Sequence, residues 1–98
     1  MAQIGFSARA FEDFERICDF YAKDDPELAR AQVRAVREAV TILADHPLIG
    51  RLVKHGLREL VISRGKTGFV ALYRFSPAMD LVSILRIRHQ RELGYPQG

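Results

Sequence analysis

Apolar side chains recur every three to four positions near the start of the chain, which is the period of an α-helix. The polar residues between them, such as Glu12, Glu15 and Lys23, fall on the opposite side. Ser7 precedes this segment and is a favoured N-cap residue. The pattern predicts an amphipathic helix from Ala8 to near Lys23, with an apolar stripe of Phe11, Phe14, Cys18 and Tyr21.

A second helical pattern begins at Asp25 and Pro26, a capping residue followed by a proline suited to the first helical position. It runs to about Ala44, and His46-Pro47 then ends it. At ~100° per residue its apolar residues cover an arc of about 200°, whereas a surface helix usually needs little more than about 100°. We therefore expect an antiparallel helical hairpin whose second helix contacts two neighbours at once.

The rest of the chain changes to strand patterns rich in Val, Ile, Leu, Phe and Tyr. Gln3–Phe6 adds a short edge strand, and Leu48–Gly56 is expected to be a loop. The predicted order is β-α-α-β-β-β, an α+β fold with a helical hairpin packed on a small, mainly antiparallel sheet, and residues 1–98 form a single domain. The three strands of the predicted meander are Leu57–Ser63, Phe69–Phe75 and Leu81–His89.

Alternation along the predicted strands gives each of them a face that ends in arginine. On the last strand, one side carries Val82, Ile84, Arg86 and Arg88. If the strands are in matching register, part of one sheet face is lined by Arg58, Arg74, Arg86 and Arg88.

Composition is that of a globular chain, with 98 residues of which 48% are hydrophobic and 28% charged. No apolar run approaches the ~20 residues of a membrane span, and the N-terminus lacks the pattern of a signal peptide. The single cysteine, Cys18, excludes an internal disulfide and is expected to be a core residue. These features favour the cytoplasm.

The net charge of +3 is unevenly distributed along the chain. Residues 1–48 hold six basic and nine acidic residues, whereas residues 49–98 hold nine basic residues and only Glu59, Asp80 and Glu92. A basic half of this kind faces RNA, DNA or an acidic protein partner, although ordinary surface charge explains it equally well.

The familiar cofactor motifs are absent from the sequence. His46, His55 and His89 have no metal-ligand spacing, and no glycine-rich nucleotide motif occurs. Gly65-Lys66-Thr67-Gly68 is interpreted as a turn between strands, because no helix N-terminus follows to hold a phosphate. We therefore expect neither a metal nor a cofactor.

Two features remain as candidates for function. The C-terminal run of arginine, histidine and tyrosine includes the residue types for metal-free RNA cleavage, but no general base with a supporting partner is identifiable. The alternative is a solvated strand end that binds an acidic partner. The excess apolar surface on the hairpin, if contiguous and exposed, would suit a groove for a partner helix. The alternative, slightly favoured for each residue taken alone, is that Phe20 packs against a loop and Val33 against the sheet.

Four ordered segments resemble signatures of the ParE/RelE superfamily of bacterial toxins, and of its ParE-like, plasmid stabilisation branch in particular. They are Ala-Asp-His-Pro-Leu-Ile-Gly-Arg (44–51), Leu-Arg-Glu-Leu (57–60), Val-Ala-Leu-Tyr-Arg (70–74) and Ile-Leu-Arg-Ile-Arg-His-Gln-Arg-Glu (84–92). The resemblance covers nearly the whole chain, and the β-α-α-β-β-β order is similar too.

The resemblance implies the toxin of a type II toxin–antitoxin system, neutralised by direct binding of a ParD-like antitoxin. ParE-like toxins inhibit DNA gyrase, and RelE-like toxins cut mRNA on the ribosome. The short tail after the last strand favours the gyrase inhibitor, without enzymatic chemistry. The alternatives are an mRNA interferase and a non-toxic binding module with the same fold.

Each function implies its own residues. Antitoxin binding is assigned to Phe11, Phe20, Val33, Val40 and Arg74. Target binding is assigned to Arg86, Arg88, His89, Arg91 and Tyr95, with direct nucleic-acid binding possible but not favoured. If the chain is a ribonuclease, the resemblance implies catalysis by Arg58, Arg86, His89 and Tyr95.

Overall fold

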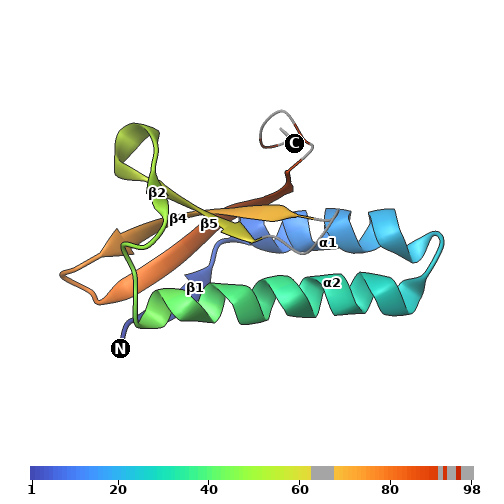
Figure 1. Cartoon of the computed structure of the whole chain (residues 1–98), viewed down its shortest axis with the longest axis horizontal. Coiled ribbons are helices and arrows are strands. Elements are labelled where there is room, and N and C mark those ends of the chain that lie inside the picture. Colours follow the sequence, from blue (N-terminus) through green and yellow to red (C-terminus); the bar gives the residue numbers. More distant parts are fainter. Residues whose placement is uncertain (63–67, 91, 93–94, 96–98) are drawn as a thin grey trace.

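The computed structural model describes residues 1–62, 68–90, 92 and 95, in which two helices cover one face of a five-stranded sheet (Figure 1). The predicted α+β class is confirmed, as is the order of the two helices and the four predicted strands, to which the structure adds the short strand β2. The elements are β1 (Gln3–Phe6), α1 (Ala8–Ala22), α2 (Pro26–Ala39), the 3₁₀ helix η1 (Val40–Ala44), β2 (Arg51–Leu52), the 3₁₀ helix η2 (Lys54–Gly56), β3 (Arg58–Ile62), β4 (Phe69–Ser76) and β5 (Leu81–His89).

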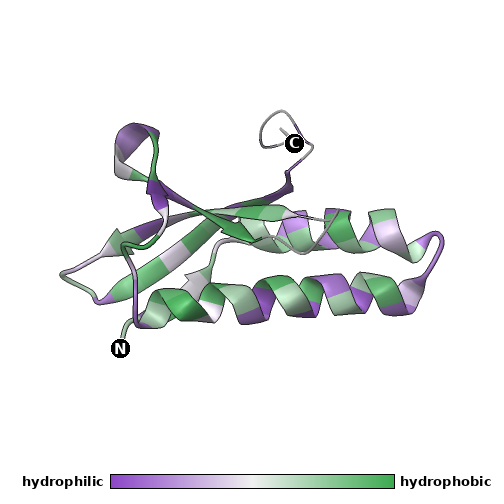
Figure 2. Ribbon diagram, viewed as in Figure 1, coloured by the Kyte–Doolittle hydropathy of each residue, from purple (hydrophilic) through white to green (hydrophobic). Residues whose placement is uncertain are grey.

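Both helices begin where the capping residues predict. The Ser7 hydroxyl accepts a hydrogen bond from the Ala10 N–H at 3.0 Å, and the Asp25 carboxylate accepts from the N–H groups of Glu27 and Leu28. Figure 2 shows apolar and polar residues alternating along α1 and α2, which is the predicted amphipathic pattern. In the described part of the chain, no helix is long and apolar enough to cross a membrane.

The second helix ends earlier than predicted. Its α-helical part stops at Ala39, and residues 40–44 wind as the tighter η1. Three consecutive β-branched residues, Val40 to Ile42, disfavour a continued α-helix, and the Thr41 hydroxyl donates to the Glu38 carbonyl oxygen at 2.6 Å. The η1 segment still delivers Leu43 to the core, where it is fully buried.

The sheet has the strand order β1-β5-β4-β3-β2, with β1 parallel to β5 and the other pairs antiparallel. The edge position predicted for Gln3–Phe6 is confirmed. The predicted loop at residues 48–56 is wrong in part, because β2 and η2 lie within it. Arg51 and Leu52 of β2 pair with Glu59 and Arg58 of β3.

A β-bulge corrects the predicted strand faces. Leu72 pairs with Arg86, but Tyr73 pairs with Ile84, so Leu85 is an extra residue on β5. After the bulge, the Ile87 side chain lies on the helix-facing side and is buried. The side chains of Arg86 and Arg88 lie on the opposite face of the sheet. The prediction that Val82 and Ile84 share a face with these arginines is therefore wrong.

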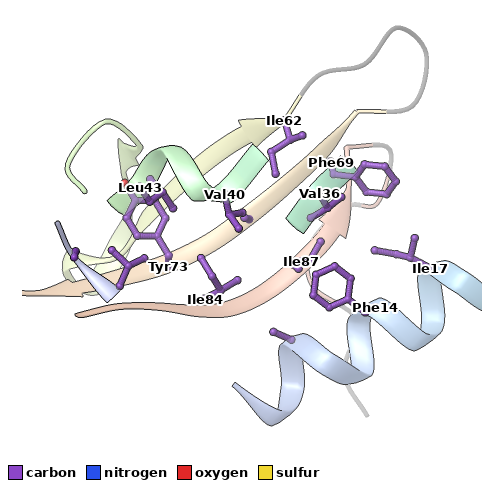
Figure 3. Packing of buried hydrophobic residues seen from close by; sticks show 14 residues of the cluster. Phe14, Ile17, Val36, Val40, Leu43, Ile62, Phe69, Tyr73, Ile84 and Ile87 are labelled. Atoms are coloured by element: carbon purple, nitrogen blue, oxygen red, sulfur yellow. The ribbon is translucent and has the colours of Figure 1, made fainter. Parts of the chain in front are cut away.

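The core lies between the hairpin and the helix-facing side of the sheet (Figure 3). Tyr73, Ile84 and Ile87 are fully buried there, and full burial of an isoleucine side chain stabilises the fold by about 1.5–3 kcal/mol. The helices contribute Phe14, Ile17, Val36, Val40 and Leu43. The opposite side of the sheet, which we call the open face, carries Glu59, Leu72, Arg74, Arg86 and Arg88.

Candidate functional site

Tyr95 brings two of the predicted arginines together on the open face. Its ring lies under the guanidinium groups of Arg86 and Arg88, at 5.6 and 5.3 Å from the ring centroid. Its hydroxyl donates to Glu59 Oε2 at 2.7 Å, which connects the tail to β3. Arg86, Arg88 and Tyr95, three of the five residues assigned to target binding, therefore form a cluster.

Glu59 is the acidic centre of this cluster, and only 7% of the residue is exposed. Arg51 donates to its other oxygen, Oε1, at 2.7 Å. Burial alone would raise the pKa of Glu59, but hydrogen bonds from Tyr95 and Arg51 and the charge of Arg88 outweigh it and lower that pKa. Burial and the bond to Glu59 raise the pKa of Tyr95, so its phenol stays protonated and donates.

Asp13 of α1 holds Arg86 from the other side. Its carboxylate accepts from Arg86 Nε at 2.8 Å and from a terminal nitrogen of Arg86 at 3.0 Å, and it also accepts from the Ile87 N–H at 2.8 Å. The hydrogen bond with Asp13 is the main reason that the pKa of Arg86 is raised. The Arg86 side chain is 16% exposed. Arg86 is therefore largely buried and ion-paired, which does not fit the alternative of a solvated strand end at this residue.

Arg88 reaches the start of the C-terminal tail. One of its terminal nitrogens donates to the carbonyl oxygens of His89 and Glu92, at 3.3 and 3.0 Å. Glu92 in turn accepts from the His89 N–H at 2.8 Å and from Arg16 at 3.4 Å. Arg88 Nε is buried and has no hydrogen-bond partner among the described residues.

The four residues assigned to RNA cleavage do not converge. Arg86 and Tyr95 lie on the open face, whereas Arg58 pairs with Tyr73 on the helix-facing side. His89 follows Arg88 in the strand and packs edge to face against the Phe69 ring at 5.3 Å. The sequence predicted that one sheet face carries Arg58, Arg74, Arg86 and Arg88. The prediction is wrong for Arg58, which lies on the helix-facing side. The target-binding residue Arg91 lies outside the described residues.

A groove of about 590 Å³ runs between α1 and α2. Its apolar side chains come from Phe14, Cys18 and Val33, so Cys18 lines a groove and is only partly buried. Charged and polar side chains also line it, namely Glu15, Arg30, Arg34, Arg37, Glu38 and Thr41.

The residues assigned to antitoxin binding have different surroundings. Phe11 and Phe20 of α1 are 56% and 68% exposed, and Val33 lines the groove. Val40 is 1% exposed and packs in the core, so its assignment to a binding surface is corrected. Arg74 is exposed but lies on the open face, on the other side of the sheet from the hairpin.

Sequence reasoning missed Asp13, Glu59 and Arg51 as members of the open-face cluster. For Asp13 the available signal was its position in the sequence, directly before Phe14 of the apolar stripe. For Glu59 the signal was strand alternation, which places it on the face opposite Arg58. Among the described residues, no group of three or more His, Cys, Asp or Glu side chains is arranged to hold a metal ion.

Comparison with known proteins places these features in a family context. Residues 4–94 match the family described as "ParE toxin of type II toxin-antitoxin system, parDE". Two relatives from Caulobacter vibrioides are Toxin RelE2, 36% identical over 95% of this chain and 100% of the relative, and Toxin RelE3, 32% identical over 94% and 98%. A solved chain of the chromosomal ParDE TA system from P. aeruginosa superimposes with a TM-score of 0.77 at 28% identity, covering 91% of this chain and 96% of that one.

Proposed function

The chain belongs to the ParE/RelE superfamily of type II toxins, and from this premise we propose that a ParD-like antitoxin neutralises it by direct binding and that its target is DNA gyrase. With these two partners, the proposed site of action is the cytoplasm. The proposed toxin acts by binding and has no enzymatic chemistry of its own.

The groove between α1 and α2 is the proposed antitoxin site. Its apolar side chains suit one face of an amphipathic helix, and Phe11, which the helical period places on the groove side of α1, extends this surface. Phe20 lies on the opposite side of α1, so the proposal requires the antitoxin to continue around this helix beyond the groove. Arg30, Arg34 and Arg37 along α2 favour an acidic partner segment. The matched P. aeruginosa structure is described as a ParDE system, which supports an antitoxin as the partner.

One observation carries the proposal of binding over catalysis. Arg86 is tied to Asp13 and the Tyr95 phenol to Glu59, while Arg58 and His89 lie on the other side of the sheet. Metal-free RNA cleavage needs a base, an acid and cations around one phosphate. The residues that the ribonuclease alternative requires are instead divided between two faces, with the open-face members engaged in internal contacts.

The mRNA interferase remains the second candidate function. Glu59, Tyr95 and Arg88 place a carboxylate, a phenol and a guanidinium within one cluster, and these are residue types used in acid–base cleavage. Two relatives carry the name RelE. A non-toxic binding module is the third candidate, because one fold hosts several functions.

The proposal is tested with purified components. DNA gyrase is incubated with the chain, and supercoiling of relaxed plasmid is followed with and without the cognate antitoxin. We expect loss of supercoiling that the antitoxin restores at a one-to-one or higher ratio. Unimpaired gyrase, together with cleavage of mRNA on translating ribosomes, would transfer the assignment to the interferase.

A further inference from the structure

Three large aliphatic side chains project into solvent within five residues around β2. Leu48, Ile49 and Leu52 are 59%, 54% and 61% exposed. Single exposed aliphatic residues are common on protein surfaces, but an apolar group of this size on one short segment is typical of an interaction site. We call these three side chains the β2 patch.

The segment that carries the β2 patch is held in place by its backbone. The Gly50 N–H donates to the Tyr73 hydroxyl at 2.8 Å, inside the core. Arg58 donates to the carbonyl oxygens of Leu48 and Gly50, at 3.2 and 3.0 Å. Because these bonds already fix the backbone of the segment, little conformational entropy would be lost from it when a partner binds.

The Arg58 side chain connects the two ends of the patch segment. Leu52 is the cross-strand partner of Arg58, so the two side chains share the helix-facing side of the sheet. The guanidinium of Arg58 then reaches the Leu48 carbonyl. Arg58 therefore bonds the backbone at Leu48 and lies beside Leu52, which brings the two ends of the segment to one side chain.

Charge around the patch indicates the chemistry of the partner. Residues 46–58 contain Arg51, Lys54 and Arg58 with two histidines, and the acidic residues that flank this range are Asp45 and Glu59. Glu59 is buried and paired with Arg51, so basic side chains outnumber acidic ones at the surface around the patch. Lys54 and His55 lie exposed in η2, directly after the patch. An apolar centre with a basic surround is complementary to an apolar protein surface with an acidic surround.

We propose that the β2 patch is a contact surface for the toxin's target protein, whose matching surface is apolar at its centre and acidic around it. This inference rests on the proposed function, in which the antitoxin occupies the hairpin groove. Arg51 bonds Glu59, and Glu59 bonds Tyr95, so the patch is linked around the β2 edge to the cluster proposed for target binding. The target surface thus includes both sides of this edge.

The test is a double substitution, Leu48→Ser with Leu52→Ser, in the full chain. Colony formation after induction without antitoxin measures toxicity, and thermal melting and titration with the cognate antitoxin measure folding and neutralisation. We expect at least a tenfold rise in surviving colonies, with the melting temperature and antitoxin affinity unchanged. Leu28→Ser, an exposed leucine at the start of α2 beyond the patch, is the matched control and stays as toxic as the parent.

Lys54→Glu provides a second variant, which introduces an acidic charge at an exposed position without touching the core. It should also raise survival, because it repels an acidic target surface. Full toxicity of both variants would overturn the inference, as would loss of antitoxin affinity by the double variant at an unchanged melting temperature. If the parent chain stops translation instead of DNA synthesis, gyrase is the wrong target, while loss of toxicity in the variants still supports the patch.

Discussion

Asp13 links α1 to β5 through a carboxylate that is almost completely buried. Removing it would leave the guanidinium of Arg86 without its strongest partner and the Ile87 N–H without an acceptor. We therefore predict that Asp13→Ala lowers the free energy of unfolding by about 3–5 kcal/mol, measured by urea denaturation. Asp19→Ala, on the exposed side of α1, should change it by less than about 0.5 kcal/mol. Equal effects of the two substitutions would refute this role for Asp13.

Glu59 makes stability depend on pH in the acid range. Its native pKa lies below the ordinary value of 4.5, so its contribution is fully present above that value and is lost as pH falls through the native pKa. Glu59→Gln cannot titrate, and we predict a smaller loss of stability between neutral pH and pH ~3 for this variant than for the parent. Melting temperatures across that range measure it, and identical slopes for parent and variant would contradict the prediction.

The open-face cluster was only partly predictable at the residue level. The sequence indicated Arg86, Arg88 and Tyr95 because basic and aromatic residues concentrate near the C-terminus. It did not indicate Asp13 as the partner of Arg86, because these residues lie 73 positions apart and meet only when α1 packs against β5. The assignments to antitoxin and target stay predictions.

Among the elements, β5 shows both the strength and the limit of sequence patterns. Its bounds, Leu81–His89, were predicted correctly from composition and turn residues. The bulge at Leu85 was not, because strict alternation was assumed along the whole strand. The consecutive apolar residues Ile84 and Leu85 mark the position where the pairing with β4 shifts by one residue. One extra residue therefore moved Arg86 and Arg88 to the open face.

The segment before β3 depends on Gly50 for its close approach to the core. A Cβ at this position would lie 2.6 Å from the Tyr73 ring and 2.9 Å from the Glu59 carbonyl oxygen. We predict that Gly50→Ala destabilises the fold by about 1–3 kcal/mol, because a ring and a strand backbone would both have to shift. Gly5→Ala meets its nearest atom at 3.9 Å and serves as the control, which thermal melting should show to be tolerated.

The helical hairpin carries the prediction for the antitoxin. Phe20 is 68% exposed, so Phe20→Glu should leave the melting temperature nearly unchanged. We propose that the antitoxin continues from the groove around α1 to this side of the helix, so replacing the apolar ring by a carboxylate should weaken binding at least tenfold in a titration. Unchanged affinity would place the antitoxin elsewhere on the surface.

Across the whole molecule, the charge asymmetry of the sequence separates the helical hairpin with β1 from the other four strands of the sheet. The acidic first half forms β1 and the helical hairpin, and the basic second half forms strands β2 to β5. The order of elements was predictable because each has its own period and its own caps. Strand register was not, because it depends on contacts between distant segments.

The molecule also separates its two proposed surfaces. The groove is lined by residues of α1, α2 and η1, whereas the β2 patch lies on the segment around β2, and the two share no residue. Substitutions confined to one surface should therefore have separable effects on neutralisation and toxicity.

The most direct test of the proposed function is pulse labelling of DNA and protein synthesis in cells, minutes after the chain is induced without its antitoxin. We predict that DNA synthesis falls first while translation continues, because the proposed target is gyrase. Early loss of translation with DNA synthesis intact would contradict this and identify the chain as an mRNA interferase. Normal rates of both, with normal growth, would contradict toxicity itself and leave a binding module with the toxin fold.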